Sequence, residues 1–172
     1  MPLSTGSKAK LNSLHPRLAA ACLKMSEMAD VAGISFSVTQ APRTMSEQDA
    51  LFAQPCDGKD NDGDGLVDEK DEKVTNAKAG YSWHNFGLAF DIVVLDALGK
   101  PNWKAADPAY GKLGAIGKSC GLEWGGDWKT FKVLPHYQLP TTMSLAEARQ
   151  LFVDGGVSAV WAELDKADAT AT

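Results

Sequence analysis

Apolar side chains recur at helical and strand spacing in the first third of the chain. Pro16 suits the first turn of a helix, and apolar residues then follow at intervals of three or four until Gly33 can end the helix. Ile34, Phe36 and Val38 alternate with polar residues, which predicts a half-buried strand. Thr44 and Glu47 form a capping box, which predicts a short helix that ends near Pro55.

The second half of the chain has a stronger strand followed by helices and short strands. Leu88, Phe90, Ile92 and Val94 alternate after a glycine, which favours a strand over a helix. Asp107-Pro108 is a strong helix start, and Gly121 can end that helix. Short strands are expected at 122–124 and 136–139, and helices at 144–153 and 158–164.

The 172 residues are enough for one domain with a real core. No apolar run approaches the roughly 18 residues of a membrane span, so we expect no membrane insertion. Residues 1–10 lack the apolar segment of a secretory signal, which predicts synthesis in the cytoplasm without a signal peptide. No basic patch with interleaved aromatic residues occurs, so no nucleic-acid partner is expected.

The acidic residues are concentrated in one glycine-rich stretch. Residues 57–72 hold eight of the 22 acids, and we interpret about 56–80 as an inserted loop. Within it, residues 60–71 fit the twelve-residue calcium loop of an EF-hand, with Gly65 at the sharp turn. The predicted calcium ligands are Asp60, Asp62, Asp64, the Leu66 carbonyl, Asp68 and Asp71. Asp71 replaces the usual bidentate glutamate, and a solvated acidic loop without an ion is the alternative interpretation.

Two of the three histidines lie in segments that suggest metal ligands. His84 and Asp91 lie seven residues apart at the start of the predicted strand, and His136 is the best third candidate. Two histidines and one carboxylate are a common protein ligand set for catalytic zinc. Spacing alone does not bring His84 and His136 together, and a buried, hydrogen-bonded histidine is commoner than a ligand.

Several motifs in order resemble one enzyme family. Ser82-x-His84-x-x-Gly87-x-Ala89-x-Asp91 is similar to the signature of zinc peptidases related to D-Ala-D-Ala carboxypeptidases and vancomycin-resistance dipeptidases. Four further segments narrow the resemblance to phage endolysins of the L-alanyl-D-glutamate peptidase type: Arg43-Thr44-x-x-Glu47-Gln48, residues 74–77, residues 124–128 and residues 135–137. The resemblance covers about residues 14–161.

The resemblance implies both a fold and a site. The expected fold is α+β, a small antiparallel sheet with flanking helices, as in the D-Ala-D-Ala carboxypeptidase and hedgehog-like zinc peptidases. His84, Asp91 and His136 would bind zinc, Ser82 would help to hold the substrate, and Arg43 would stabilise the oxyanion. Trp124, Asp127 and Trp128 would shape the cleft.

The chain departs from the family at the general base. The family places an acidic residue three positions before the last histidine, where this chain has Val133. Valine cannot accept a proton, and losing a general base typically costs about 10²–10⁴-fold in rate. Glu123 and Asp127 are the nearby carboxylates that could replace it. An inactivated variant, a base borrowed from one of these residues and a naturally weak enzyme are the three explanations.

These observations predict a zinc-dependent peptidoglycan endopeptidase for host cell lysis. We expect residues 1–172 to form a single, monomeric peptidase domain with a disordered tail from about 166, released to the cell wall by a separate pore-forming protein. A D,D- or L,D-carboxypeptidase and a catalytically silent peptidoglycan-binding module are the alternatives. We further expect calcium to order the inserted loop, since it joins Arg43 and its helix to Ser82 and His84.

Overall fold

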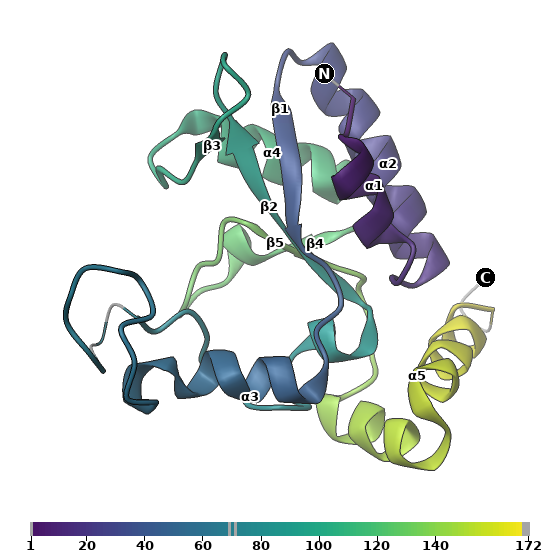
Figure 1. Ribbon diagram of the computed structural model, residues 1–172. Helices are drawn as coiled ribbons and strands as arrows, with labels where there is room; N and C mark the ends of the chain where they lie inside the picture. The colour runs from purple at the N-terminus through teal and green to yellow at the C-terminus, as the bar shows by residue number, and fades with distance from the viewer. Residues whose placement is uncertain (1, 69, 71, 170–172) are drawn as a thin grey trace.

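The computed structural model describes residues 2–68, 70 and 72–169 (Figure 1). The strands form one antiparallel sheet with helices around it, as the family resemblance implied. In chain order, the elements are α1 (Thr5–Leu11), α2 (Pro16–Val31), β1 (Ser35–Gln40), α3 (Met45–Ala53), η1 (Gln54–Cys56), η2 (Trp83–Phe86), β2 (Ala89–Leu95), β3 (Pro101–Asn102), α4 (Pro108–Ser119), β4 (Glu123–Trp124), η3 (Gly125–Asp127), β5 (His136–Gln138) and α5 (Leu145–Ala169).

The long strand β2 is the centre of the sheet. The strand order is β1-β2-β5-β4, and the short strand β3 also pairs with β2. All of these pairs are antiparallel. In the β1–β2 pair the register shifts between Val38 and Gln40, where Gln40 lies opposite Asp91. Such an irregularity changes the direction of a strand and is frequent beside active sites.

The predicted helix starts are confirmed by their caps. The Thr44 side chain accepts a hydrogen bond from the Glu47 N–H, and the Glu47 carboxylate accepts one from the Thr44 N–H. Asp107 caps α4 with a single bond, which its side chain accepts from Ala109 N. Helix α1 was not predicted, because only Ser7 and Leu11 are buried in it and no apolar stripe results.

The two C-terminal helices that the sequence predicted are joined into α5. Gly155 and Gly156 have non-helical backbone angles, and the helix bends between its two halves there. The second half continues through 166–169, where the sequence predicted the start of a disordered tail. Residues 170–172 of that tail lie outside the described residues.

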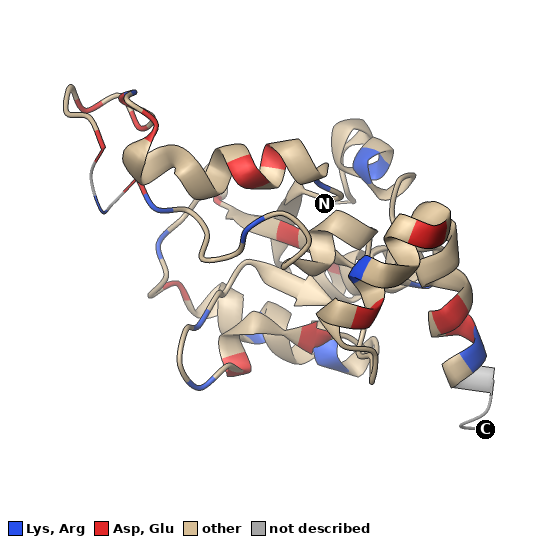
Figure 2. Cartoon of the chain, turned by 90° about the horizontal axis from the view of Figure 1, so that it is seen from below, with Lys and Arg blue, Asp and Glu red and all other residues tan. Residues whose placement is uncertain are grey.

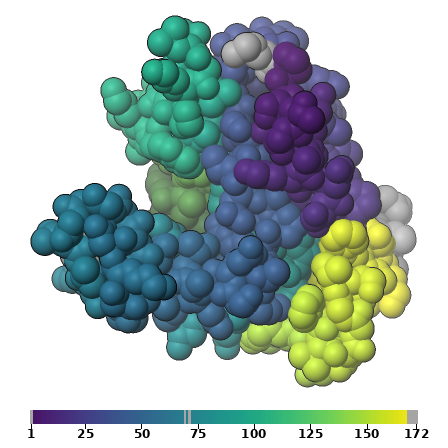
Figure 3. All heavy atoms as spheres, viewed as in Figure 1, coloured from purple at the N-terminus to yellow at the C-terminus, as the bar shows by residue number. Residues whose placement is uncertain are grey.

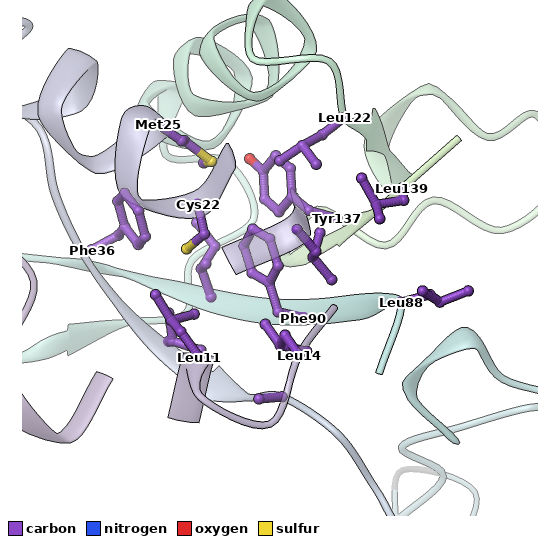
Figure 4. Packing of buried hydrophobic residues seen from close by; sticks show 14 of the residues in the cluster. Leu11, Leu14, Cys22, Met25, Phe36, Leu88, Phe90, Leu122, Tyr137 and Leu139 are labelled. Carbon is purple, nitrogen blue, oxygen red and sulfur yellow. The ribbon is translucent and has the colours of Figure 1, made fainter. Parts of the chain in front are cut away.

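The core lies between one face of the sheet and helices α1, α2 and α4 (Figure 4). The rings of Phe90 on β2 and Tyr137 on β5 stack with centroids 5.5 Å apart. Cys22 and Met25 on α2 are fully buried in the same cluster. Because successive strand residues face opposite sides, this packing turns Asp91 and His136 away from the core. No helix in the described ranges is long and apolar enough to cross a membrane.

Helix α4 packs so closely that two of its glycines leave no room for a side chain. A Cβ atom on Gly117 would lie 2.5 Å from Cε1 of Tyr137, and one on Gly114 would lie 2.4 Å from the Trp124 ring. A Cβ on Gly111, in the same helix, would meet no heavy atom within 4 Å. The glycines at 114 and 117 therefore set the distance between α4 and the sheet.

We expect Gly117→Ala to destabilise the protein and Gly111→Ala to stabilise it. Alanine in a helix gains about 0.5–1 kcal/mol over glycine when there is space, which applies at position 111. At position 117 the methyl group must displace the Tyr137 ring, and overpacking of this kind costs about 1–3 kcal/mol. Urea unfolding of the two variants measures both free energies, and a change of the same sign at both positions would refute the packing argument.

Candidate metal centre and catalytic cleft

Three side chains meet on the face of the sheet opposite the core. Asp91 on β2 and His136 on β5 are directly paired across the two strands, and His84 lies in η2 just before β2. Asp91 Oδ1 is 3.1 Å from His136 Nδ1 and 3.3 Å from His84 Nε2. The two histidine nitrogens are 3.3 Å apart. The three residues that the sequence nominated are thus brought together, although they span more than fifty positions.

The turn that carries His84 is capped at both ends. The Ser82 hydroxyl accepts a hydrogen bond from His84 N at 3.4 Å, and Gly87 ends the turn with φ of 67°. A left-handed residue at this position is usually glycine, since it has no Cβ. Ser82, predicted to hold substrate, lines the cleft and also fixes the backbone of His84.

Hydrogen bonds on the outer side of each ring set the tautomers. His84 Nδ1 is 2.8 Å from the carbonyl oxygen of Ala41, so Nδ1 carries the proton and Nε2 has a free lone pair. His136 Nε2 is 3.0 Å from Gln138 Oε1, and the Gln138 amide donates to Glu123 Oε2 at 2.8 Å. A carboxylate only accepts, so Glu123 fixes the amide orientation, and His136 turns its unprotonated Nδ1 to the centre.

The geometry of the three acceptors fits a zinc ion. Their separations of 3.1–3.3 Å match the edge of a tetrahedron, which is about 3.3 Å for ligands at about 2.0–2.1 Å from zinc. Three lone pairs directed at one point repel one another unless a cation lies between them. Imidazole nitrogen and carboxylate oxygen are the donors that zinc takes in catalytic sites, with the fourth position open.

Arg43 holds the second oxygen of the aspartate. Its Nη2 is 3.1 Å from Asp91 Oδ2, while Nη1 donates to the fully buried Gln48 at 3.3 Å. In the metal-free protein, burial would raise the pKa of Asp91, but a positively charged His84 and hydrogen bonds from both histidines, when the nitrogens that face Asp91 carry protons, hold this pKa well below its usual range. A bound cation would take the place of those protons. Burial lowers the pKa of Arg43, and Asp91 partly opposes that shift. Asp91 is therefore ionised, with Oδ1 directed to the centre.

The three residues lie in a cleft of about 870 Å³. Figure 3 shows a hollow between the segment around β3 and the projecting segment at 56–80. Its lining includes Arg43, Ser82, Trp128 and Val133, together with residues 74–77 that precede the metal centre. A cavity of this size holds a ligand as large as a drug molecule.

Neither nominated replacement for the general base reaches this cleft. Asp127 pairs with Lys118 on the surface at 2.7 Å, with half of its side chain exposed. Glu123 bonds to Gln138 behind His136. Val133 itself lines the cleft, and Asp91 is the only carboxylate residue in that lining among the described residues. Of the aromatic residues expected to shape the cleft, Trp128 lines it, whereas Trp124 packs against α4 and donates to the Leu134 carbonyl.

The acidic loop projects from the body beyond α3 (Figure 2). Carboxylate oxygens of Asp60, Asp62 and Glu72 lie within 4.8 Å of one another, and Glu72 is buried. Asp64 and Asp68 are not in this group, and they accept from Leu66 N and Gly58 N. The three grouped carboxylates also accept backbone N–H bonds, Asp60 from Gly63 and Gly65, Asp62 from Asp64 and Glu72 from Asn61. Asp71, the predicted last ligand, lies outside the described residues. Glu72 was not predicted, because it falls one position beyond the twelve-residue pattern.

Two glutamines, Gln48 and Gln138, hold other residues of the site in place. The sequence analysis did not predict this role for either of them. Gln138 follows His136 by two residues, and strand periodicity alone places both on one face. Gln48 connects Arg43 to the cleft wall, because its amide donates to Thr75 Oγ1 at 3.2 Å and to the Ala77 carbonyl at 2.8 Å. Nothing in the local pattern of α3 distinguishes Gln48 from an exposed glutamine.

Sequence comparison identifies relatives with named activities. The family model described as D-alanyl-D-alanine carboxypeptidase matches residues 75–139. The peptidoglycan L-alanyl-D-glutamate endopeptidase CwlK of Bacillus subtilis is 31% identical over 135 residues, which is 74% of each chain. An L-alanyl-D-glutamate peptidase of a Listeria phage is 40% identical over 76 residues, which is 40% of this chain and 26% of the relative.

Solved structures share the fold. The L-Ala D-Glu endopeptidase ChiX of Serratia marcescens superposes with a TM-score of 0.60 at 23% identity, over 81% of this chain and 90% of that chain. The vancomycin-resistance D,D-pentapeptidase VanY, solved with Zn(II), gives 0.55 at 17% identity, over 80% and 78% of the two chains. The chain therefore belongs to the family of D-alanyl-D-alanine carboxypeptidases and peptidoglycan L-alanyl-D-glutamate endopeptidases, which are zinc metallopeptidases.

Proposed function

We propose that this protein is a zinc-dependent phage endolysin that hydrolyses the L-alanyl-D-glutamate bond of peptidoglycan stem peptides. The observation that carries the proposal is the convergence of Asp91 Oδ1, His84 Nε2 and His136 Nδ1 at 3.1–3.3 Å in a large cleft. The activities named for CwlK and for the Listeria phage relative support this bond as the substrate.

In this proposal the chain's residues orient the reactants. His84, Asp91 and His136 would hold zinc, which would acidify a water molecule and polarise the substrate carbonyl. Arg43 holds Asp91 so that only Oδ1 faces the centre, and its charge stabilises the oxyanion that forms on the carbonyl. Ser82 contacts the substrate from the turn beside His84. Trp128, whose ring centroid is 5.0 Å from that of His136, shields this ligand from solvent.

A catalytically silent module that binds peptidoglycan is the second candidate function. Val133 favours it, because valine lines the cleft at the position where the family resemblance implies a general base. The ligands do not depend on this side chain, so a silent protein would keep its metal centre. The two candidates differ in turnover and agree in metal binding.

We also propose that the acidic loop binds calcium. Asp60 and Asp62 from the predicted set, together with the buried Glu72, supply carboxylates within 4.8 Å of one another. Carboxylates at such distances repel one another without a cation, and calcium takes oxygen ligands of this kind. The loop leads from α3 to Ser82, so calcium would order one wall of the cleft.

We further propose that the whole chain acts as a monomeric peptidase domain at the cell wall.

Gln138→Ala is expected to weaken zinc binding by about 10–100-fold, because His136 loses the group that fixes its tautomer. Glu123→Gln should cost less, since glutamine can still accept from the Gln138 amide. Competition with a chromophoric chelator measures the zinc dissociation constants. Gln150→Ala, which changes an exposed glutamine on α5, is the matched control. Unchanged affinity in Gln138→Ala would contradict the role given to this residue.

Val133→Asp is expected to raise the rate of peptidoglycan hydrolysis by up to about 10²–10⁴-fold, because it supplies the missing proton acceptor. Val133→Asn, of nearly the same shape but unable to accept the proton, should give no increase. Mass spectrometry of digested muropeptides identifies the bond that each protein cleaves. Cleavage by the unmodified chain would exclude the silent module, and release of a terminal D-alanine would reassign the enzyme as a carboxypeptidase.

Calcium is expected to raise the melting temperature of the unmodified protein, and the double variant Asp60→Asn/Asp62→Asn should lose this response. The reason is that a ligand bound only to the folded state stabilises it by mass action. Differential scanning calorimetry with calcium or with a calcium-selective chelator measures the shift, with zinc content checked in parallel. Glu27→Gln on α2 is the control. An identical melting temperature with and without calcium would show that the loop binds none.

A further inference from the structure

Exposed aromatic side chains are concentrated around the metal centre. Within the described residues, the aromatic side chains among the exposed large apolar ones are those of Tyr81, Trp103, Trp128 and Phe131, which are 54%, 59%, 37% and 58% exposed. All four line the cleft that holds His84, Asp91 and His136. Exposed apolar groups that gather at one place mark a binding surface.

Two of the four rings already have partners. The Arg149 guanidinium lies 4.0 Å from the centroid of the Tyr81 ring, and Trp128 lies against His136. Trp103 and Phe131 make no ring contact or side-chain hydrogen bond with any part of the chain that the structure describes. Trp103 follows β3 on the way to α4, and Phe131 lies between η3 and β5, so two separate segments bring them to the same cleft.

The chemistry of the proposed substrate places a sugar close to the metal centre. In peptidoglycan, the L-alanine of the stem peptide is joined through its amine to the lactyl group of N-acetylmuramic acid. Only one residue, about 3.3–3.6 Å of extended chain, therefore separates the scissile bond from the lactyl group of the glycan strand. A cleft of about 870 Å³ exceeds what the two residues flanking the bond would fill, and it has room for the sugar ring.

The free rings suit a sugar better than a longer stretch of stem peptide. The stem peptide beyond D-glutamate carries carboxylate and ammonium groups, which need charged partners. Among the described residues of the cleft lining, the lysine and arginine side chains are those of Lys132 and Arg43, and the sole carboxylate is that of Asp91. Arg43 and Asp91 are already paired with each other. A pyranose ring instead presents an apolar C–H face, which stacks on an indole or phenyl ring while its hydroxyls stay in water.

We propose that Trp103 and Phe131 form a subsite for the muramoyl sugar next to the scissile bond. The subsite rests on the proposed function, because only cleavage at the first peptide bond of the stem puts the sugar this near to the metal centre. It makes the enzyme prefer stem peptides that are still attached to glycan over free peptides.

The test compares two probes that differ only in the sugar. One is an N-acetylmuramoyl stem peptide, and the other is the same peptide with an acetyl group in place of the muramoyl unit. The unmodified protein and the variants Trp103→Ala, Phe131→Ala, Trp103→Tyr and Leu98→Ala are compared. Leu98 is 80% exposed and does not line the cleft, so Leu98→Ala is the control. Calorimetry gives the dissociation constant of each probe, and chromatography gives KM and kcat.

Trp103→Ala and Phe131→Ala should each raise the dissociation constant and the KM of the muramoyl probe by roughly three- to tenfold, the effect of one lost ring contact. Neither variant should change the dissociation constant or the KM of the acetyl probe, or the melting temperature of the protein. Trp103→Tyr keeps a stacking face and should retain most of the affinity. Equal losses on both probes, or no loss on either, would overturn the sugar subsite.

The outcomes also separate this proposal from the proposed function. If the unmodified protein cleaves both probes with the same KM, and Trp103→Ala does not change this KM, the subsite is refuted. The proposed reaction would still hold. A preference for binding the muramoyl probe that Trp103→Ala removes, without cleavage between L-alanine and D-glutamate, would keep the sugar subsite. In that case the assigned reaction would be wrong.

Discussion

The pairing of β2 with β5 is the constraint on which the site depends. Asp91 lies directly opposite His136, while Phe90 lies opposite Tyr137, so one register sets both the metal face and the core stack. A slip of one residue would exchange the two faces and turn the ligands into the core. The stacked rings therefore stabilise the register that forms the metal centre, because any other register would lose the ring packing as well as the ligand set.

The remaining geometry comes from groups that are not ligands. The Ala41 carbonyl, just beyond β1, fixes the tautomer of His84, and the Gln138 amide fixes that of His136. The irregular register near Gln40 allows β1 to leave the sheet beside Asp91 and to carry Arg43 to the aspartate. Each ligand is thus held from behind, His84 and Asp91 by the segment that follows β1 and His136 by Gln138 on β5, which orients three lone pairs at one point before any ion binds.

The sequence predicted most of the fold because its signals are local. Pro16, the Thr44 capping box and Asp107-Pro108 mark helix starts through contacts within one turn, and alternation marks β1 and β2. The meeting of His84 and His136 could be expected only from the family resemblance, since it depends on strand register. Glu72 was missed because it lies just beyond the twelve-residue loop pattern. The hydrogen bonds of Gln48 and the placing of Trp103 and Phe131 in one cleft were missed because they join segments that are distant along the chain.

The contacts around Val133 explain how the residue implied as the general base can be absent while the metal ligands remain. Val133 is held by its backbone, since its N–H donates to the Gly125 carbonyl at 3.0 Å and its own carbonyl accepts from His136 N at 3.1 Å. A Cβ on Gly125 would lie 2.5 Å from the Val133 oxygen, so the turn needs glycine there, whereas the backbone hydrogen bonds of Val133 do not depend on its side chain. An acid at this position would serve chemistry and not folding. In the proposed function, valine at this position would leave the fold and the ligands intact and would lower turnover alone.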